Sequence, residues 1–106
     1  MSPITTHVLD TARGVPAAGV PVTLERGPDW TEVGSGRTGD DGRLAELSSP
    51  SDPGTYRLRF DTAAYFRGTP AFFPEVTVQF TVERADEHFH VPLLLSPFGY
   101  STYRGS

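Results

Sequence analysis

The sequence contains no cysteine, so it has no disulfide, no thiol nucleophile and no cysteine-ligated zinc site. It has no apolar run near the roughly 18 residues that a membrane-spanning helix requires. Its nine basic residues are spread along a chain of net charge -4. Because nucleic-acid binding needs several phosphate contacts on one face, we expect no nucleic-acid partner. The missing apolar run leads us to expect no membrane partner either.

Several motifs are also missing. The sequence has no GxSxG, P-loop, GxGxxG or HExxH motif, which excludes the enzyme classes that depend on them. Residues 1–10 show neither the basic nor the apolar region of a secretory signal. We therefore predict a cytoplasmic protein.

Glycine and proline are frequent, with 11 and 10 copies, and they separate short segments in which apolar and polar residues alternate. This spacing is typical of an all-β protein with a Greek-key or sandwich arrangement. We expect one domain covering residues 1–106, with enough length for an ordinary core. The predicted strands are residues 4–9, 20–26, 31–37, 56–60, 76–82, 88–95 and 100–103.

The connections carry their own signals. Residues 61–67 are predicted to form a short helix, with Asp61 as the N-cap and Gly68 as the stop. Residues 10–19 are predicted to form a loop, and the Asp-Gly pair at residues 41–42 indicates a turn. Residues 84–87 are predicted to form a hairpin turn.

Three histidines lie on two of the predicted strands. His88 and His90 are two residues apart and share one face, while the phenylalanine and valine that alternate with them share the other. Since the apolar face should point to the core, the histidines should face solvent or another subunit. His7 shares a face with Thr5 on the first strand, and that face is not the obvious core either.

Three interpretations of these histidines stay open at this point. They are ordinary surface residues, or His88 and His90 are ligands of a zinc or copper ion, for which His-x-His is a known spacing. The third is acid–base chemistry, because the histidine pKa suits proton transfer near neutral pH.

Arginine and tyrosine side chains provide further candidates. Arg43 directly follows the Asp-Gly turn. It is either a solvated turn residue or a residue whose planar guanidinium binds a ring carbonyl or an oxyanion with two N–H donors. Tyr103, Arg104 and Ser106 end the chain beside the terminal carboxylate. Residues 97–100 supply a turn and two aromatic rings that would fold this segment back, so we predict a docked end.

Taken together, these segments resemble the 5-hydroxyisourate hydrolases, the transthyretin-like enzymes of urate breakdown. The resemblance covers the whole chain, and its most specific element is the terminal Tyr-Arg-Gly-Ser, which transthyretin lacks. The matching segments are THVLD (6–10), GVPV (19–22), DGR (41–43), FFPE (72–75), HFHVPLLLSP (88–97) and YRGS (103–106).

The resemblance implies a transthyretin-like (prealbumin-like) Greek-key β-sandwich of seven to eight strands with one short helix. It also implies a homotetramer with active sites at the dimer–dimer interface and an edge-pairing role for the His-x-His strand. The implied reaction converts a small purine-derived substrate, 5-hydroxyisourate, to 2-oxo-4-hydroxy-4-carboxy-5-ureidoimidazoline without a cofactor or metal. The implied catalytic residues are His7, Arg43 and His90, and the implied substrate-binding residues are His7, Arg43, Tyr103, Arg104 and Ser106.

Two alternative functions accompany this expectation. One is a non-enzymatic, transthyretin-like carrier of a small aromatic ligand, for which a channel lined by small or apolar residues would be expected. The other is a metal-dependent hydrolase that uses His88 and His90. Which histidine is the general base, and what His88 does, are left open by the sequence.

Overall fold

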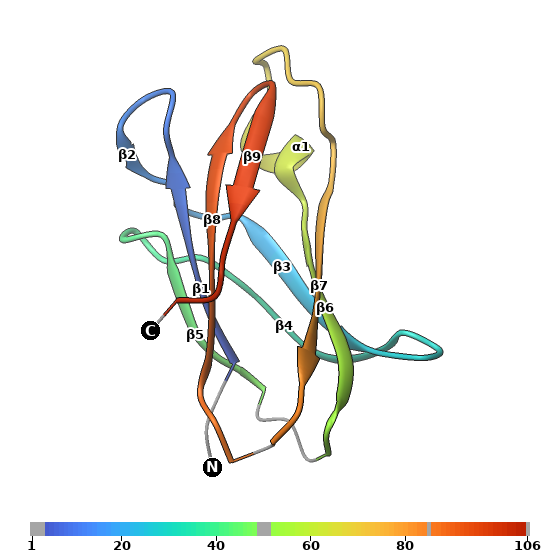
Figure 1. Cartoon of the computed structure of the whole chain (residues 1–106). Helices are drawn as coiled ribbons and strands as arrows, with labels where there is room; N and C mark the ends of the chain where they lie inside the picture. The colour runs from blue at the N-terminus through green and yellow to red at the C-terminus, as the bar shows by residue number, and fades with distance from the viewer. Residues whose placement is uncertain (1–3, 49–51, 85, 106) are drawn as a thin grey trace.

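Two β-sheets pack face to face in this protein (Figure 1). The structure is a computed structural model that describes residues 4–48, 52–84 and 86–105. No helix among these residues has the length and apolar character needed to cross a membrane. The elements are β1 (Ile4–Asp10), β2 (Val15–Pro16), β3 (Pro21–Arg26), β4 (Thr31–Arg37), β5 (Arg43–Ser48), β6 (Gly54–Phe60), α1 (Thr62–Tyr65), β7 (Val76–Val82), β8 (Phe89–Ser96) and β9 (Gly99–Thr102).

The first sheet is built around β1 and β8, which run parallel to each other although they lie at opposite ends of the sequence. One side of β1 pairs with β8, and its other side pairs with β2 near one end and β5 near the other. The outer side of β8 pairs with β9. The second sheet has the order β4-β3-β6-β7, and all its pairs are antiparallel.

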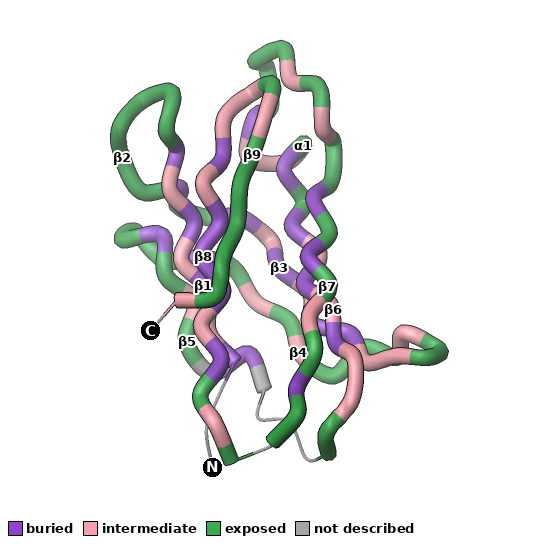
Figure 2. The backbone as a smooth tube through the Cα atoms, in the orientation of Figure 1, coloured by how far each residue is buried: buried purple, intermediate pink, exposed green. Residues whose placement is uncertain are grey.

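The core lies between the sheets and is filled by every second residue of the strands (Figure 2). Ile4 and Val8 of β1, Leu93 of β8, and Leu24 and Leu58 of the second sheet are fully buried. Burying one such side chain stabilises the fold by about 1.5–3 kcal/mol. The alternation read from the sequence is confirmed, and β4 and β7 have the predicted bounds.

The predicted helix is present as the single turn α1. The Asp61 side chain accepts a hydrogen bond from Ala64 N at 3.0 Å, as an N-cap does. Gly68 has a φ of +82°, a conformation that other residues rarely adopt, which explains why it ends this segment. The Tyr65 hydroxyl donates to Asp10 Oδ2 at 2.6 Å and so ties α1 to the end of β1.

Two strands were not predicted. The segment of β5 contains Leu, Ala and Glu, which favour helices, so its sequence does not indicate a strand. It is extended because it adds to the edge of β1. The segment predicted as a loop at residues 10–19 contains β2, whose two residues pair with the last two of β1.

Two further expectations about the His-x-His strand were wrong. The hairpin predicted between β7 and β8 is not formed, because the two strands lie in different sheets. The strand β8 is not an edge strand, because β1 and β9 flank it. The alternation of apolar and polar residues identified β7 and β8 as strands, but it carried no information about which strands they pair with.

Arg57 and Arg59 of β6 point away from the core and contact Glu25 of β3. Arg57 Nε lies 2.5 Å from Glu25 Oε1, and Arg59 Nη1 lies 3.0 Å from Oε2. Burial alone would raise the pKa of Glu25, but its hydrogen bonds to the two arginines and their charges outweigh this and lower the pKa. The Arg57 guanidinium also covers the Trp30 ring at 4.2 Å.

Candidate active site

Strand pairing brings the three predicted catalytic residues to one face of the first sheet. His7 of β1 is directly opposite Arg43 of β5, and Thr5 of β1 is directly opposite His90 of β8. Thr5 and His7 are two residues apart and therefore point to the same side of β1. Their neighbours Ile4 and Val8 are buried on the other side, so the group lies on the outer face of the sandwich.

Arg43 owes its position to the preceding turn. Gly42 has a φ of +79°, and a β-carbon there would overlap the Val8 carbonyl oxygen. The same close approach allows Val8 N to donate to Gly42 O at 2.8 Å. The turn is closed by Arg43 N donating to Asp41 Oδ1 at 3.0 Å. The Arg43 side chain is 60% exposed, so its guanidinium is accessible to a ligand.

The ring of His7 is held by the same turn. Its Nε2 lies 2.9 Å from the carbonyl oxygen of Asp41. Because a carbonyl only accepts hydrogen bonds, Nε2 carries a proton and donates it here. In neutral His7 the acceptor lone pair is therefore on Nδ1.

His90 is half-buried, and its Nδ1 shares a 2.7 Å hydrogen bond with Thr5 Oγ1. Burial lowers the pKa of His90 below its ordinary value, and the positive charges of His88, Arg43 and His7 lower it further. A lowered histidine pKa means that the ring is neutral at neutral pH. His90 thus meets the first requirement of a general base, which is a free lone pair.

An open cavity of about 250 Å³ lies over this group of residues. It is lined by Thr5, Arg43, Leu44, His88 and His90, among others. Two imidazoles and a guanidinium thus surround a space large enough for a small planar molecule. The arrangement suits binding a carbonyl group, activating a water molecule and stabilising a developing negative charge.

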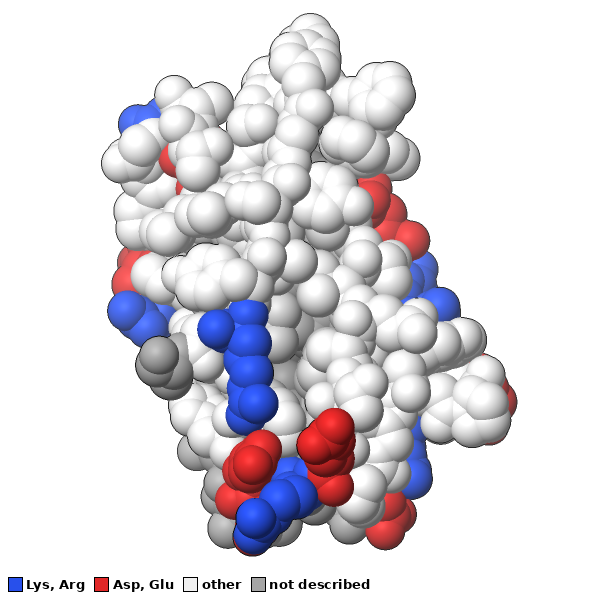
Figure 3. All heavy atoms as spheres, viewed as in Figure 1, with Lys and Arg blue, Asp and Glu red and all other residues white. Residues whose placement is uncertain are grey.

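The C-terminal segment is docked against the His-x-His segment. Gly105 N donates to His90 O at 2.8 Å. Arg104 lies 3.3 Å from Glu87, donates to His88 O at 3.4 Å and covers the Phe89 ring at 4.9 Å. Figure 3 shows basic and acidic side chains gathered at the lower end of the face viewed, and mostly uncharged atoms across its centre.

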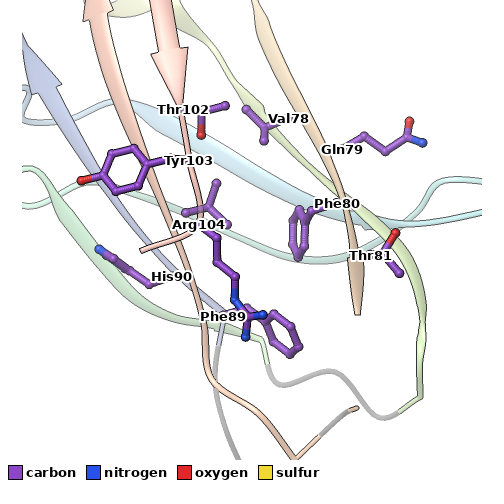
Figure 4. Close-up of a pocket in the computed structure, with 10 residues that line it drawn as sticks. Val78, Gln79, Phe80, Thr81, Phe89, His90, Thr102, Tyr103 and Arg104 are labelled. Carbon is purple, nitrogen blue, oxygen red and sulfur yellow. The ribbon is translucent and has the colours of Figure 1, made fainter. Parts of the chain in front are cut away.

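The close-up in Figure 4 separates two sides of this region. Tyr103 and His90 point to one side, while Phe80 and Phe89 lie on the other, near the space between the sheets. The Tyr103 ring is 59% exposed, which leaves it accessible to a bound molecule. Ser106, also predicted to bind substrate, lies outside the described residues.

Three residues that hold the candidate groups were not predicted from the sequence. Thr5 contacts both histidines of the His-x-His segment, Asp41 holds His7 and Arg43, and Glu87 holds Arg104. The alternation on β1 placed Thr5 beside His7, which was a usable signal. No comparable signal existed for Glu87, because its contact with Arg104 joins two separate segments.

The geometry of the histidines also bears on the metal hypothesis. His88 Nε2 and His90 Nδ1 both contact Thr5 Oγ1. Among the described residues, no three His, Asp or Glu side chains are grouped so that they could hold a metal ion.

Comparison with known proteins identifies the family. A model described as the HIUase/Transthyretin family matches residues 4–105. The chain belongs to this family. A family member from Mus musculus, a 5-hydroxyisourate hydrolase, is 51% identical and matches 99% of this chain and 96% of its own length. A 5-hydroxyisourate hydrolase of Deinococcus radiodurans is 50% identical over 97% of this chain and 95% of its own.

Another family member shows the domain within a longer protein. A uric acid degradation bifunctional protein of Arabidopsis thaliana is 52% identical over 98% of this chain. The chain spans only 37% of that protein's length.

Solved structures of the family share the fold described above. The 5-hydroxyisourate hydrolase of Klebsiella pneumoniae superposes with a TM-score of 0.89 at 38% identity, covering 100% of both chains. Sea bream transthyretin, solved in complex with thyroxine, has a TM-score of 0.88 at 31% identity over 97% of this chain and 94% of its own. The predicted transthyretin-like sandwich is therefore confirmed.

Proposed function

We propose that this protein is an enzyme that hydrolyses 5-hydroxyisourate to 2-oxo-4-hydroxy-4-carboxy-5-ureidoimidazoline, with residues 1–106 acting as one domain and without a cofactor. The observation that carries the proposal is the placement of His7, Arg43 and His90 on one sheet face, where Arg43 and His90 line a cavity of about 250 Å³. Relatives called 5-hydroxyisourate hydrolase, about half identical over nearly the whole chain, support the same reaction.

In the proposed mechanism, His90 is the general base. Its lowered pKa keeps the ring neutral, so that it accepts a proton from a water molecule as the water attacks the ring carbonyl of the substrate. The carbonyl oxygen becomes negative, and the exposed guanidinium of Arg43 stabilises it with N–H donors. The ring C–N bond then breaks, and the proton held by His90 passes to the leaving nitrogen.

The remaining candidates bind and orient the substrate. His7, fixed by Asp41, offers Nδ1 as an acceptor for the water or for a substrate N–H. Tyr103, which is exposed and points to the same side as His90, stacks on or hydrogen-bonds to the substrate. Arg104 anchors the segment through Glu87, and Ser106 is proposed to contact the substrate at the end of the chain.

We propose that the enzyme is a homotetramer with sites at the interface between dimers. Within the described residues, β4 and β7 of one sheet and β9 of the other each pair on one side only, which leaves sheet edges for a partner. Phe98 and Tyr100 of the β8–β9 hairpin are also exposed. Light scattering with size-exclusion chromatography tests this, and the expected mass is four times that of the 11.5 kDa chain. The cytoplasmic location stays a prediction of the sequence.

The activity is tested by following the ultraviolet absorbance of freshly generated 5-hydroxyisourate with and without the protein in metal-free buffer. We expect the decay rate to rise in proportion to protein concentration and to be insensitive to chelation. His7→Ala and His90→Ala should each remove most of the turnover while the assembly stays intact. Decay at the spontaneous rate with folded wild-type protein would refute the proposal, and loss of activity on chelation would favour the metal hypothesis.

A carrier function is the second candidate, because sea bream transthyretin in complex with thyroxine has the same fold. Isothermal titration of this protein with thyroxine separates the two functions. We expect no saturable binding, since charged and imidazole groups line the cavity on this chain. Tight binding without hydrolase activity would favour the carrier.

A further inference from the structure

A single hydroxyl group bridges the two histidines of the His-x-His segment. Thr5 Oγ1 lies 2.7 Å from His90 Nδ1 and 3.1 Å from His88 Nε2. Thr5 sits on β1, which is paired on both sides, and its β-branched side chain has few rotamers. Two of the three residues of the bridge, Thr5 and His90, are therefore held in the sheet, and His88 directly precedes β8.

Proton counting limits how this bridge can be made. A threonine hydroxyl carries one proton, so it can donate to only one of the two histidines. In the other contact the histidine must donate to the oxygen. When both rings are neutral, at least one of the two histidines therefore donates to Thr5, and the single hydroxyl proton is left for the other.

The reaction decides which arrangement is productive. If Thr5 donates to His90 Nδ1, the single proton of the neutral His90 ring is on Nε2, and no ring nitrogen is left to accept a proton from water. If His90 Nδ1–H donates to Thr5, Nε2 has a free lone pair. The Thr5 proton then points to His88 Nε2, which accepts it.

We propose that Thr5 and His88 are positioning residues, which hold His90 in the tautomer that leaves its Nε2 free to act as the general base. The inference rests on the proposed hydrolase function and deepens it. It gives His88 a role, as the acceptor that fixes the direction of the Thr5 hydroxyl.

The same arrangement serves the charged state of His90. When Nε2 takes a proton from water, both ring nitrogens carry N–H groups, and Nδ1–H already donates to Thr5. No hydroxyl or ring has to turn during the step. The other charged or titratable groups that act on His90 are His88, Arg43 and His7, and a positive charge on any of them opposes a positive charge on His90. An acceptor oxygen that is already oriented toward Nδ1–H therefore stabilises the protonated ring.

The variant Thr5→Val tests the bridge, because valine keeps the branched shape and removes the hydroxyl. We expect kcat to fall about tenfold or more with little change in KM, since the loss affects proton transfer and not binding. Thr5→Ser, which restores a hydroxyl, should recover most of the rate. His88→Gln keeps an acceptor oxygen and should retain more activity than His88→Leu, with the melting temperature of each variant measured as the folding control.

A spectroscopic readout separates this inference from the proposed function. Nitrogen-15 NMR of the ring nitrogens should show neutral wild-type His90 protonated at Nδ1 and unprotonated at Nε2. In Thr5→Val the two tautomers of His90 should mix. A His90 ring protonated at Nε2 in the wild type, or an unchanged kcat in Thr5→Val, would overturn the inference even if the hydrolase function holds. If the wild-type protein does not hydrolyse 5-hydroxyisourate, the function fails, and the tautomer measurement still decides the arrangement of the bridge.

Discussion

Gly105 lies against the ring of His90 so closely that no side chain fits between them. Its amide donates to His90 O at 2.8 Å, and a β-carbon on Gly105 would come within 2.5 Å of His90 Cδ2. The end of the chain is thus packed on the proposed base.

Gly105→Ala is expected to lower kcat/KM by about tenfold or more, because either the chain end or the His90 ring must move. Steady-state kinetics with 5-hydroxyisourate measure the effect, and thermal unfolding should be nearly unchanged. Gly99→Ala is the matched control, since a β-carbon there meets its nearest atom at 3.8 Å. Equal kinetics of the two variants would contradict the proposed importance of this contact.

Arg43→Lys is expected to lower kcat/KM about 10²- to 10³-fold, the usual cost of losing an oxyanion donor. Lysine keeps the charge but has no planar fork with paired N–H donors. Arg37→Lys, at the end of β4 in the other sheet, is the control and should leave the kinetics unchanged. If Arg43→Lys behaves like this control, Arg43 does not stabilise the oxyanion.

The pH dependence of kcat/KM should report the pKa of His90. The active form is neutral, so activity is lost as the pH falls through this pKa. Because burial and the neighbouring positive charges lower the pKa, the acid limb should lie below the ordinary histidine value of about 6.5.

Glutamine cannot take up a proton at acid pH as the His88 ring can, so in His88→Gln the repulsion on a protonated His90 falls and the acid limb should move to higher pH, whatever the absolute rate. Stopped-flow absorbance between pH 5 and 8, a range on either side of the ordinary histidine pKa, measures the acid limb of the wild type and that of the variant. An acid limb of the wild type above the ordinary histidine value would contradict the assignment.

Glu25→Ala is expected to lower the free energy of unfolding by about 1–3 kcal/mol, because two arginines lose a buried partner while their partial exposure limits the cost. Urea denaturation followed by circular dichroism measures the change. Asp52→Ala removes the exposed pair with Arg26 and should cost no more than about 0.5 kcal/mol. A Glu25→Ala variant as stable as this control would show that the buried pairs contribute nothing.

Local sequence patterns predicted most of the individual elements. Alternation located seven of the strands and the faces of His7 and His90, because the side-chain period of a strand is a local property. Asp61 and Gly68 marked the ends of the helical segment through capping and positive φ, which are also local.

Tertiary structure decided which of these elements meet. The strand β5 is extended only because it pairs with β1, against the helix-favouring residues of its sequence. The parallel pairing of β1 with β8 joins segments more than 80 residues apart, and it alone places Thr5 between His88 and His90. The contact between Gly105 and His90 and the pairing of Arg104 with Glu87 arise in the same way. The sequence therefore determined which residues could do chemistry and which way they point, whereas their assembly into one site depended on long-range strand pairing, which local residue patterns do not specify.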